Sequence, residues 1–301
     1  MEKARTPDER FENLPGYDYE PNYLEIPDGD GGELRVHYLD EGLRSGEVVL
    51  LMHGEPSWSY LYRTMIPILV EAGYRVVVPD LVGFGRSDKP TDQSDYTYAR
   101  HVAWMRSVLF DHLNLEGISM FCQDWGGLIG LRLVAESPDR FDRVCVANTG
   151  MPIGEGATDA FVMWRDFATT TPDFDAGGIL QMATVNEMPD DVVAAYNAPF
   201  PDESYKAGAR IFPALVPAEE DNPAVPDTVA AWEVLKKFDK PFLVAFSDSD
   251  PITGGGDRVF HNLVPGTKGQ PHTTIEGGGH FLQEDQGATI ARKLVEWFGT
   301  T

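Results

Sequence analysis

Residues 117–127 read Gly117-Ile118-Ser119-Met120-Phe121-Cys122-Gln123-Asp124-Trp125-Gly126-Gly127. The apolar run that ends at Cys122 has the length and composition of a buried strand. Two glycines then indicate a sharp turn, and the apolar stretch Leu128 to Ser137 that follows is helical. The order strand, tight turn and helix places Asp124 at the apex of the turn.

This order is that of the nucleophile elbow of the α/β-hydrolase fold, whose pattern is G-x-S-x-G with serine at the apex. Here Asp124 takes the serine position, and Cys122 replaces the first glycine. A carboxylate is already ionised at neutral pH. It is a poor nucleophile for amide or ester carbonyls, because the adduct would be an anhydride. It can displace a leaving group from an sp³ carbon, and water can then cleave the alkyl ester. The apex residue therefore predicts a different class of reaction.

Composition limits the classes of protein to consider. The chain has 301 residues, is 42% hydrophobic and carries a formal net charge of −24, which predicts one large domain with an insertion and argues against nucleic-acid partners. The first ten residues are charged and lack the apolar core of a signal peptide. No apolar run approaches the ~18–20 residues of a membrane span. We therefore expect a cytoplasmic protein that makes no membrane contact and, by default, a monomer.

Short apolar strands alternate with amphipathic helices, which predicts a mainly parallel sheet flanked by helices. We expect an α/β-hydrolase core over residues 1–150 and 229–301, and a helical cap inserted at 151–228. The expected strands are Tyr23 to Ile26, Leu34 to Asp40, Glu47 to Met52, Arg75 to Pro79, Gly117 to Cys122, Arg143 to Ala147, Pro241 to Ser247 and His272 to Glu276. The expected helices are Ser57 to Ala72, Tyr98 to Leu113, Leu128 to Ser137, Ala160 to Thr169, Asp190 to Asn197, Tyr205 to Pro213 and Ala288 to Phe298.

Hydrolysis of an alkyl ester on Asp124 needs a base. His280 is the best placed of seven histidines, because it follows the last expected strand in a glycine-rich loop, where this fold carries its histidine. The base needs an acid partner that orients it. Asp250 is our choice, with Asp248 as the alternative, because Asn148 at the other possible position cannot serve as an anion.

Attack of water on the ester creates an oxyanion that two backbone N–H groups should bind. One is expected from Trp125, the residue after the nucleophile. The other should come from the loop His53-Gly54-Glu55-Pro56 after an apolar strand, with Glu55 as the donor.

The chain resembles the haloalkane dehalogenases. The resemblance rests on His53-Gly54-Glu55-Pro56-Ser57-Trp58, Asp80-Leu81-Val82-Gly83-Phe84-Gly85-Arg86-Ser87-Asp88-Lys89-Pro90, Gln123-Asp124-Trp125-Gly126-Gly127 and the loops of Asp250 and His280. It runs from about residue 15 to the C-terminus. It implies attack by aspartate on a small neutral halogenated alkane, departure of chloride or bromide, and hydrolysis to an alcohol without a cofactor or a metal.

Epoxide hydrolase is the rival interpretation, since it shares the fold and the aspartate nucleophile. An epoxide oxygen needs a proton on leaving, which Tyr196 or Tyr205 of the cap could supply, whereas a halide needs only donors such as indole N–H groups. The resemblance places one halide donor next to the nucleophile, at Trp125, and the second in the cap, where Trp164 is the only tryptophan. A dry pocket would be lined by apolar side chains, for which we expect Leu128, Phe161, Phe212, Pro213, Val216, Ile252 and Phe281. A scaffold that only binds a ligand is a remote third possibility.

Overall fold

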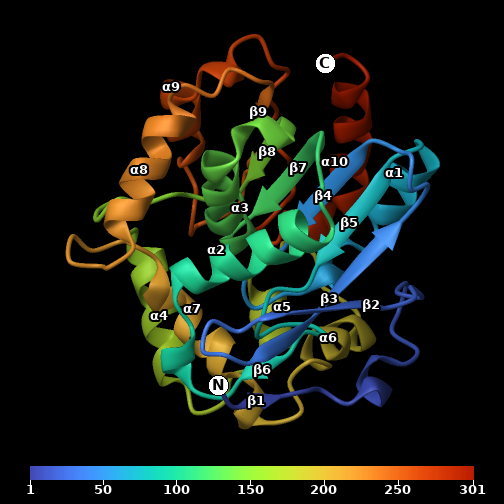
Figure 1. The fold of residues 1–301 in the computed structure, drawn as a ribbon, viewed down its shortest axis with the longest axis vertical. Helices are drawn as coiled ribbons and strands as arrows, with labels where there is room; N and C mark the ends of the chain where they lie inside the picture. The colour runs from blue at the N-terminus through green and yellow to red at the C-terminus, as the bar shows by residue number, and fades with distance from the viewer.

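The computed structural model describes residues 1–301. Seven strands form one sheet in the order β2-β3-β5-β4-β7-β8-β9, and two short strands, β1 and β6, pair separately (Figure 1). The pairs from β5 to β9 are parallel, whereas β3 is antiparallel to both of its neighbours. The strands are β1 (Lys3–Ala4), β2 (Asn22–Pro27), β3 (Glu33–Glu41), β4 (Val48–Met52), β5 (Arg75–Pro79), β6 (Lys89–Pro90), β7 (Ile118–Gln123), β8 (Phe141–Ala147) and β9 (Phe242–Val244).

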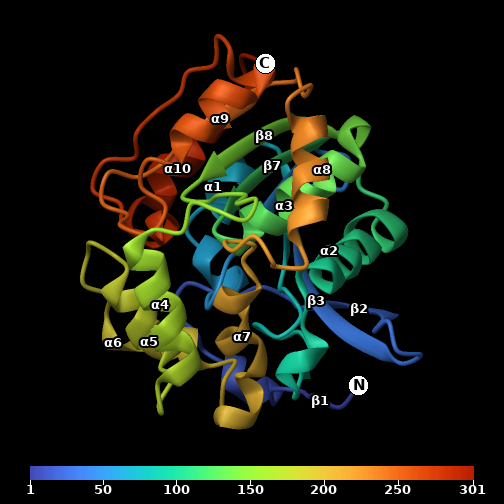
Figure 2. The ribbon, with the colours of Figure 1, turned by 90° about the vertical axis from the view of Figure 1, so that its left-hand side faces the viewer.

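Helices cover both faces of the sheet, as the apolar strands require. Figure 2 shows α2, α3 and α8 on one side of the sheet, and α1 and α10 pack against each other on the other side. Helix α9 lies at the β9 edge, where the ring of Phe260 stacks on that of Phe242. The central strands β4 and β7 are buried along their whole length. The helices are α1 (Ile66–Glu71), α2 (Tyr98–Arg106), α3 (Trp125–Glu136), α4 (Asp159–Thr170), α5 (Ala176–Met182), α6 (Asp190–Asn197), α7 (Ala207–Leu215), α8 (Val225–Leu235), α9 (Asp257–Leu263) and α10 (Leu282–Phe298). None of them is both long and apolar enough to cross a bilayer.

Helices α4 to α7 lie together in the lower part of Figure 1, below strands β7 and β8. The chain enters them after β8 and leaves them through α8, which packs against α3. The indole N–H of Trp232 in α8 donates to the Met151 carbonyl, 2.8 Å away, and so ties the two ends of this segment together. The expected boundary after residue 228 falls inside α8, whose first residue is Val225.

Two expected elements differ in the structure. The helix expected over Ser57 to Ala72 is a short 3₁₀ turn at Ser59–Tyr62 and a separate helix, α1. Pro67 stands in the first turn of α1, and since it has no N–H it cannot continue a helix from the preceding turn. Beyond Arg106, the chain continues α2 as a π-helical turn to His112.

The strand expected over His272 to Glu276 was also wrong. This segment runs beside β9, and the N–H groups of Thr273 and Ile275 donate to Val244 and Phe246. Only one bridge forms, however, between Ser247 and Ile275. The imidazole Nδ1 of His272 accepts the N–H of Val244 at 3.1 Å and so takes the place of a backbone acceptor in the ladder.

Candidate active site

Asp124 lies at the turn between β7 and α3 with φ 51° and ψ −128°. A non-glycine residue with positive φ is strained by about 1–3 kcal/mol, and two close approaches hold it there. A Cβ on Gly126 would lie 2.0 Å from the Met52 carbonyl oxygen, and one on Gly54 would lie 2.1 Å from Asp124 Oδ1. Glycine at these positions lets the loop after β4 pack directly against the carboxylate.

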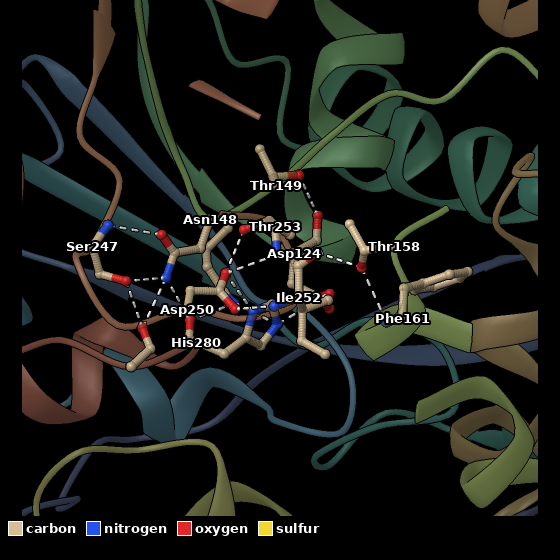
Figure 3. Close-up of polar contacts among 12 residues, drawn as sticks. Asp124, Asn148, Thr149, Thr158, Phe161, Ser247, Asp250, Ile252, Thr253 and His280 are labelled. Carbon is tan, nitrogen blue, oxygen red and sulfur yellow. Dashed lines mark hydrogen bonds and ion pairs between the residues drawn. The ribbon is translucent and has the colours of Figure 1, made fainter. Parts of the chain in front are cut away.

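Three side chains that are far apart in the sequence meet at this turn (Figure 3). His280 Nε2 lies 3.4 Å from Asp124 Oδ2, and His280 Nδ1 lies 3.0 Å from Asp250 Oδ2. Asp250 also accepts hydrogen bonds from the Ile252 N–H, at 2.8 Å, and from the Thr253 hydroxyl. The alternative acid, Asp248, instead accepts the Gly277 N–H on the surface. The imidazole therefore stands between two carboxylates, Asp124 and Asp250.

The two carboxylates determine the charge of the imidazole. Burial lowers the pKa of His280, but Asp250 and Asp124 outweigh it and raise the pKa to about 10. Burial acts in the opposite sense on Asp250 by raising its pKa, yet His280 and the hydrogen bonds from Thr253 and Ile252 lower it to about 2. At neutral pH the site without substrate therefore holds an imidazolium beside an ionised Asp250.

The sequence interpretation missed the residues that hold the His280 loop. Asn148 follows β8 with φ 36°, and its Nδ2 donates to the Gly279 and His280 carbonyls at 2.8 and 3.0 Å. Gln123 donates to the same His280 carbonyl at 3.0 Å. The Asp285 carboxylate accepts the Gly279 N–H and also the Val185 N–H of the segment after α5. A buried asparagine just beyond a core strand was the available signal, because such an amide must find partners.

Glu55 lies in the loop after β4 and donates its N–H to Asp124 Oδ1 at 2.7 Å. Trp125 is the first residue of α3, so its N–H has no acceptor within the helix. Both expected oxyanion donors thus lie within or next to the turn that holds Asp124.

A cavity of about 900 Å³ opens beside Asp124, and its wall includes His280, Glu55 and Trp125. Leu128, Phe161, Pro213, Val216, Ile252 and Phe281 also line it. Phe212, the seventh expected wall residue, does not. Its ring is fully buried and lies behind Trp125, with the two ring centres 4.6 Å apart. Phe212 and Pro213 are adjacent in α7, so they point in different directions.

The six tryptophans fall into two groups. Four donate their indole N–H to protein acceptors: Trp58, Trp104, Trp232 and Trp297. Trp125 and Trp164 form no such bond, and both line the cavity. Tyr196 and Tyr205 are absent from the wall, and Tyr196 is fully buried and donates to Glu284 at 2.5 Å. No three His, Cys, Asp or Glu side chains are grouped so that they could hold a metal ion.

Comparisons with known proteins agree with this geometry. The model of the alpha/beta hydrolase fold family matches residues 47–286. A haloalkane dehalogenase of Psychrobacter cryohalolentis is 59% identical over 298 residues, which cover 99% of this chain and 98% of that protein. One of Mycobacterium marinum is 50% identical over 298 residues, 99% of this chain and all of that protein.

Among solved structures, the haloalkane dehalogenase of Paraglaciecola agarilytica, described as tetrameric, is similar with a TM-score of 0.89. It is 38% identical and matches over 97% of both chains. The expected fold, a mainly parallel sheet flanked by helices, is confirmed. The chain belongs to the haloalkane dehalogenases, within the alpha/beta hydrolase fold family.

Proposed function

We propose that this enzyme hydrolyses small neutral haloalkanes to an alcohol, a halide and a proton, through a covalent alkyl ester on Asp124. The observation that carries the proposal is the availability of two indole N–H donors at the cavity. Trp125 and Trp164 have indole N–H groups without a protein acceptor, and both line the cavity beside the nucleophile. Indole N–H donates and cannot accept, so the pair suits a departing anion that needs no proton.

In the first step, an Asp124 oxygen attacks the carbon that bears the halogen, in line with the bond that breaks. The carbon–halogen electron pair leaves with the halide, which Trp125 and Trp164 bind. The apolar side chains of Leu128, Phe161, Pro213, Val216, Ile252 and Phe281 exclude water from the substrate and strengthen these hydrogen bonds. We assign residues 151–228 the role of a cap that closes this pocket and supplies Trp164.

In the second step, His280 takes a proton from water, which attacks the ester carbonyl carbon of Asp124. Asp250 fixes the imidazole with Nδ1 protonated and stabilises its charge. The N–H groups of Glu55 and Trp125 bind the oxyanion. Collapse of this intermediate breaks the bond between the Asp124 carboxyl carbon and the alkoxy oxygen, releases the alcohol and restores Asp124.

The direct test is release of halide from 1-bromobutane or 1,2-dibromoethane by the purified protein, with styrene oxide in parallel. We expect halide and alcohol, and no diol from the epoxide, because neither Tyr196 nor Tyr205 lines the cavity to protonate an opening epoxide. Formation of the diol without release of halide would instead establish that the protein is an epoxide hydrolase. Trp164 would then have only a packing role and no role in halide binding.

Replacing Trp164 with phenylalanine removes one halide donor and keeps most of the aromatic volume. A hydrogen bond to a charged group is worth about 1.5–3 kcal/mol, so bromide should bind at least about tenfold more weakly. Titration of intrinsic fluorescence with bromide measures this change. The matched control is Trp297→Phe, because the N–H of Trp297 donates to Gln270 outside the cavity. Equal bromide affinity in Trp164→Phe and the control would remove Trp164 from the halide site.

A further inference from the structure

The side chain of Glu55 is a buried acid that the mechanism above leaves without a role. Only the backbone N–H of Glu55 enters the oxyanion site, whereas the residue as a whole is 4% exposed and lines the same cavity as Asp124 and His280. Its Oε1 is buried and has no hydrogen-bond partner in the protein. Buried polar atoms without a partner are rare, and this one belongs to a residue that lines the same cavity as the nucleophile and the base.

The surroundings of the Glu55 carboxyl favour its neutral form. Burial and then the Asp124 carboxylate raise the pKa of Glu55 well above its usual range, and the His280 charge offsets only part of this rise. Both groups of the reaction are therefore close enough to influence Glu55. A neutral carboxyl has a carbonyl oxygen that accepts a hydrogen bond, and it adds no negative charge beside the nucleophile.

We propose that the Glu55 side chain holds the water that hydrolyses the alkyl ester. Glu55 accepts a hydrogen bond from one O–H group of this water, and His280 accepts a hydrogen bond from the other. The inference rests on the proposed function and extends it to the attacking water. With both hydrogens engaged, the oxygen lone pair of the water points to the ester carbonyl carbon, and orientation of this kind accelerates a step.

The step balances without another reactant. The water oxygen forms a bond to the Asp124 carbonyl carbon, and its first proton passes to His280 Nε2. The second stays on the oxygen, hydrogen-bonded to Glu55. When the intermediate collapses, the bond between the Asp124 carboxyl carbon and the alkoxy oxygen breaks, His280 gives its proton to that leaving oxygen, and the alcohol departs. Asp124 regains its charge by losing the remaining proton to solvent.

The test separates the two chemical steps in variants of Glu55. Glu55→Met has a similar volume and no carbonyl, whereas Glu55→Gln keeps a carbonyl acceptor. All variants keep the backbone N–H that faces Asp124. Rapid-quench experiments with 1-bromobutane measure halide release as the alkylation rate and decay of the alkyl-enzyme as the hydrolysis rate.

In Glu55→Met we expect hydrolysis to slow about 100-fold and alkylation to change less than about threefold. The alkyl ester accumulates, so kcat and KM fall together and kcat/KM stays nearly constant. Glu55→Gln should lose no more than about fivefold in the hydrolysis rate. A merely structural role for Glu55 would slow both steps and would lower kcat/KM.

Unchanged hydrolysis in Glu55→Met, or slowing of alkylation alone, would overturn the inference. If Glu55→Met does not fold, Glu55→Ala cannot overpack the site and gives the same comparison with Glu55→Gln. Halide release by the wild-type protein tests the proposed function itself. A wild type that releases no halide defeats that function, whereas an active wild type with unaffected variants defeats only the role of Glu55.

Discussion

A single halide ion is expected from each molecule of the His280→Phe variant, followed by almost no further release. Substitution by Asp124 needs no base, so the first step proceeds and the alkyl ester forms. Hydrolysis then lacks the group that deprotonates water, and loss of such a base slows a step by about 10²–10⁴-fold. The intact mass should rise by one butyl group in place of one hydrogen after incubation with 1-bromobutane.

The matched control is His112→Phe, which changes an exposed histidine on the π-helical turn after α2 and should turn over at the wild-type rate without an adduct. If His280→Phe released halide continuously at that rate, another residue would have to be the base. The adduct also separates an enzyme from a scaffold that only binds a ligand, since simple binding leaves the mass unchanged.

The opposite result is expected for Asp124→Asn, in which no halide and no adduct should form. The amide is nearly the same size and can still accept the Glu55 N–H, which donates to Asp124 Oδ1, but it carries no charge to attack carbon. Removal of a nucleophile costs up to about 10⁶-fold in kcat. Halide release followed over hours, together with the intact mass of the protein, would measure any activity that remains in the variant.

Asp142→Asn is the control for this change, because Asp142 is exposed near the start of β8. A thermal unfolding curve shows whether Asp124→Asn still folds. The strained backbone at residue 124 belongs to the turn rather than to the carboxylate, so the fold should survive. Rapid formation of an alkyl adduct in Asp124→Asn would mean that a different side chain attacks.

The elements of the reaction were predictable because each follows a strong local pattern. Asp124 stands between an apolar strand and a glycine turn, and His280 and Asp250 lie in loops after strands whose ends converge in this fold. The structure places the His280 imidazole 3.4 Å from Asp124 and 3.0 Å from Asp250. Their roles, and those of Trp125 and Trp164, stay predictions until the variants are measured.

The directions in which individual side chains point, and their local packing, were harder to predict from the sequence. Apolar character placed Phe212 in the pocket, but helix geometry turns it behind Trp125. The short helices α5 and α9 have too few residues for a clear periodic pattern. His272 uses a side-chain nitrogen where a strand would use a carbonyl, and the positive φ of Asn148 depends on partners more than 90 positions away in the sequence.

In the mechanism that we propose, the position of His280 between two carboxylates imposes an internal order of events. While Asp124 is ionised, the imidazole keeps its proton at neutral pH and has no lone pair on Nε2 to offer to water. Esterification removes the Asp124 charge, so the imidazole holds its proton less tightly and becomes a base. Water is thus activated only after a substrate has been attached. The negative charge of Asp124 therefore has two effects: it makes the carboxylate a nucleophile, and it keeps His280 protonated until substitution is complete.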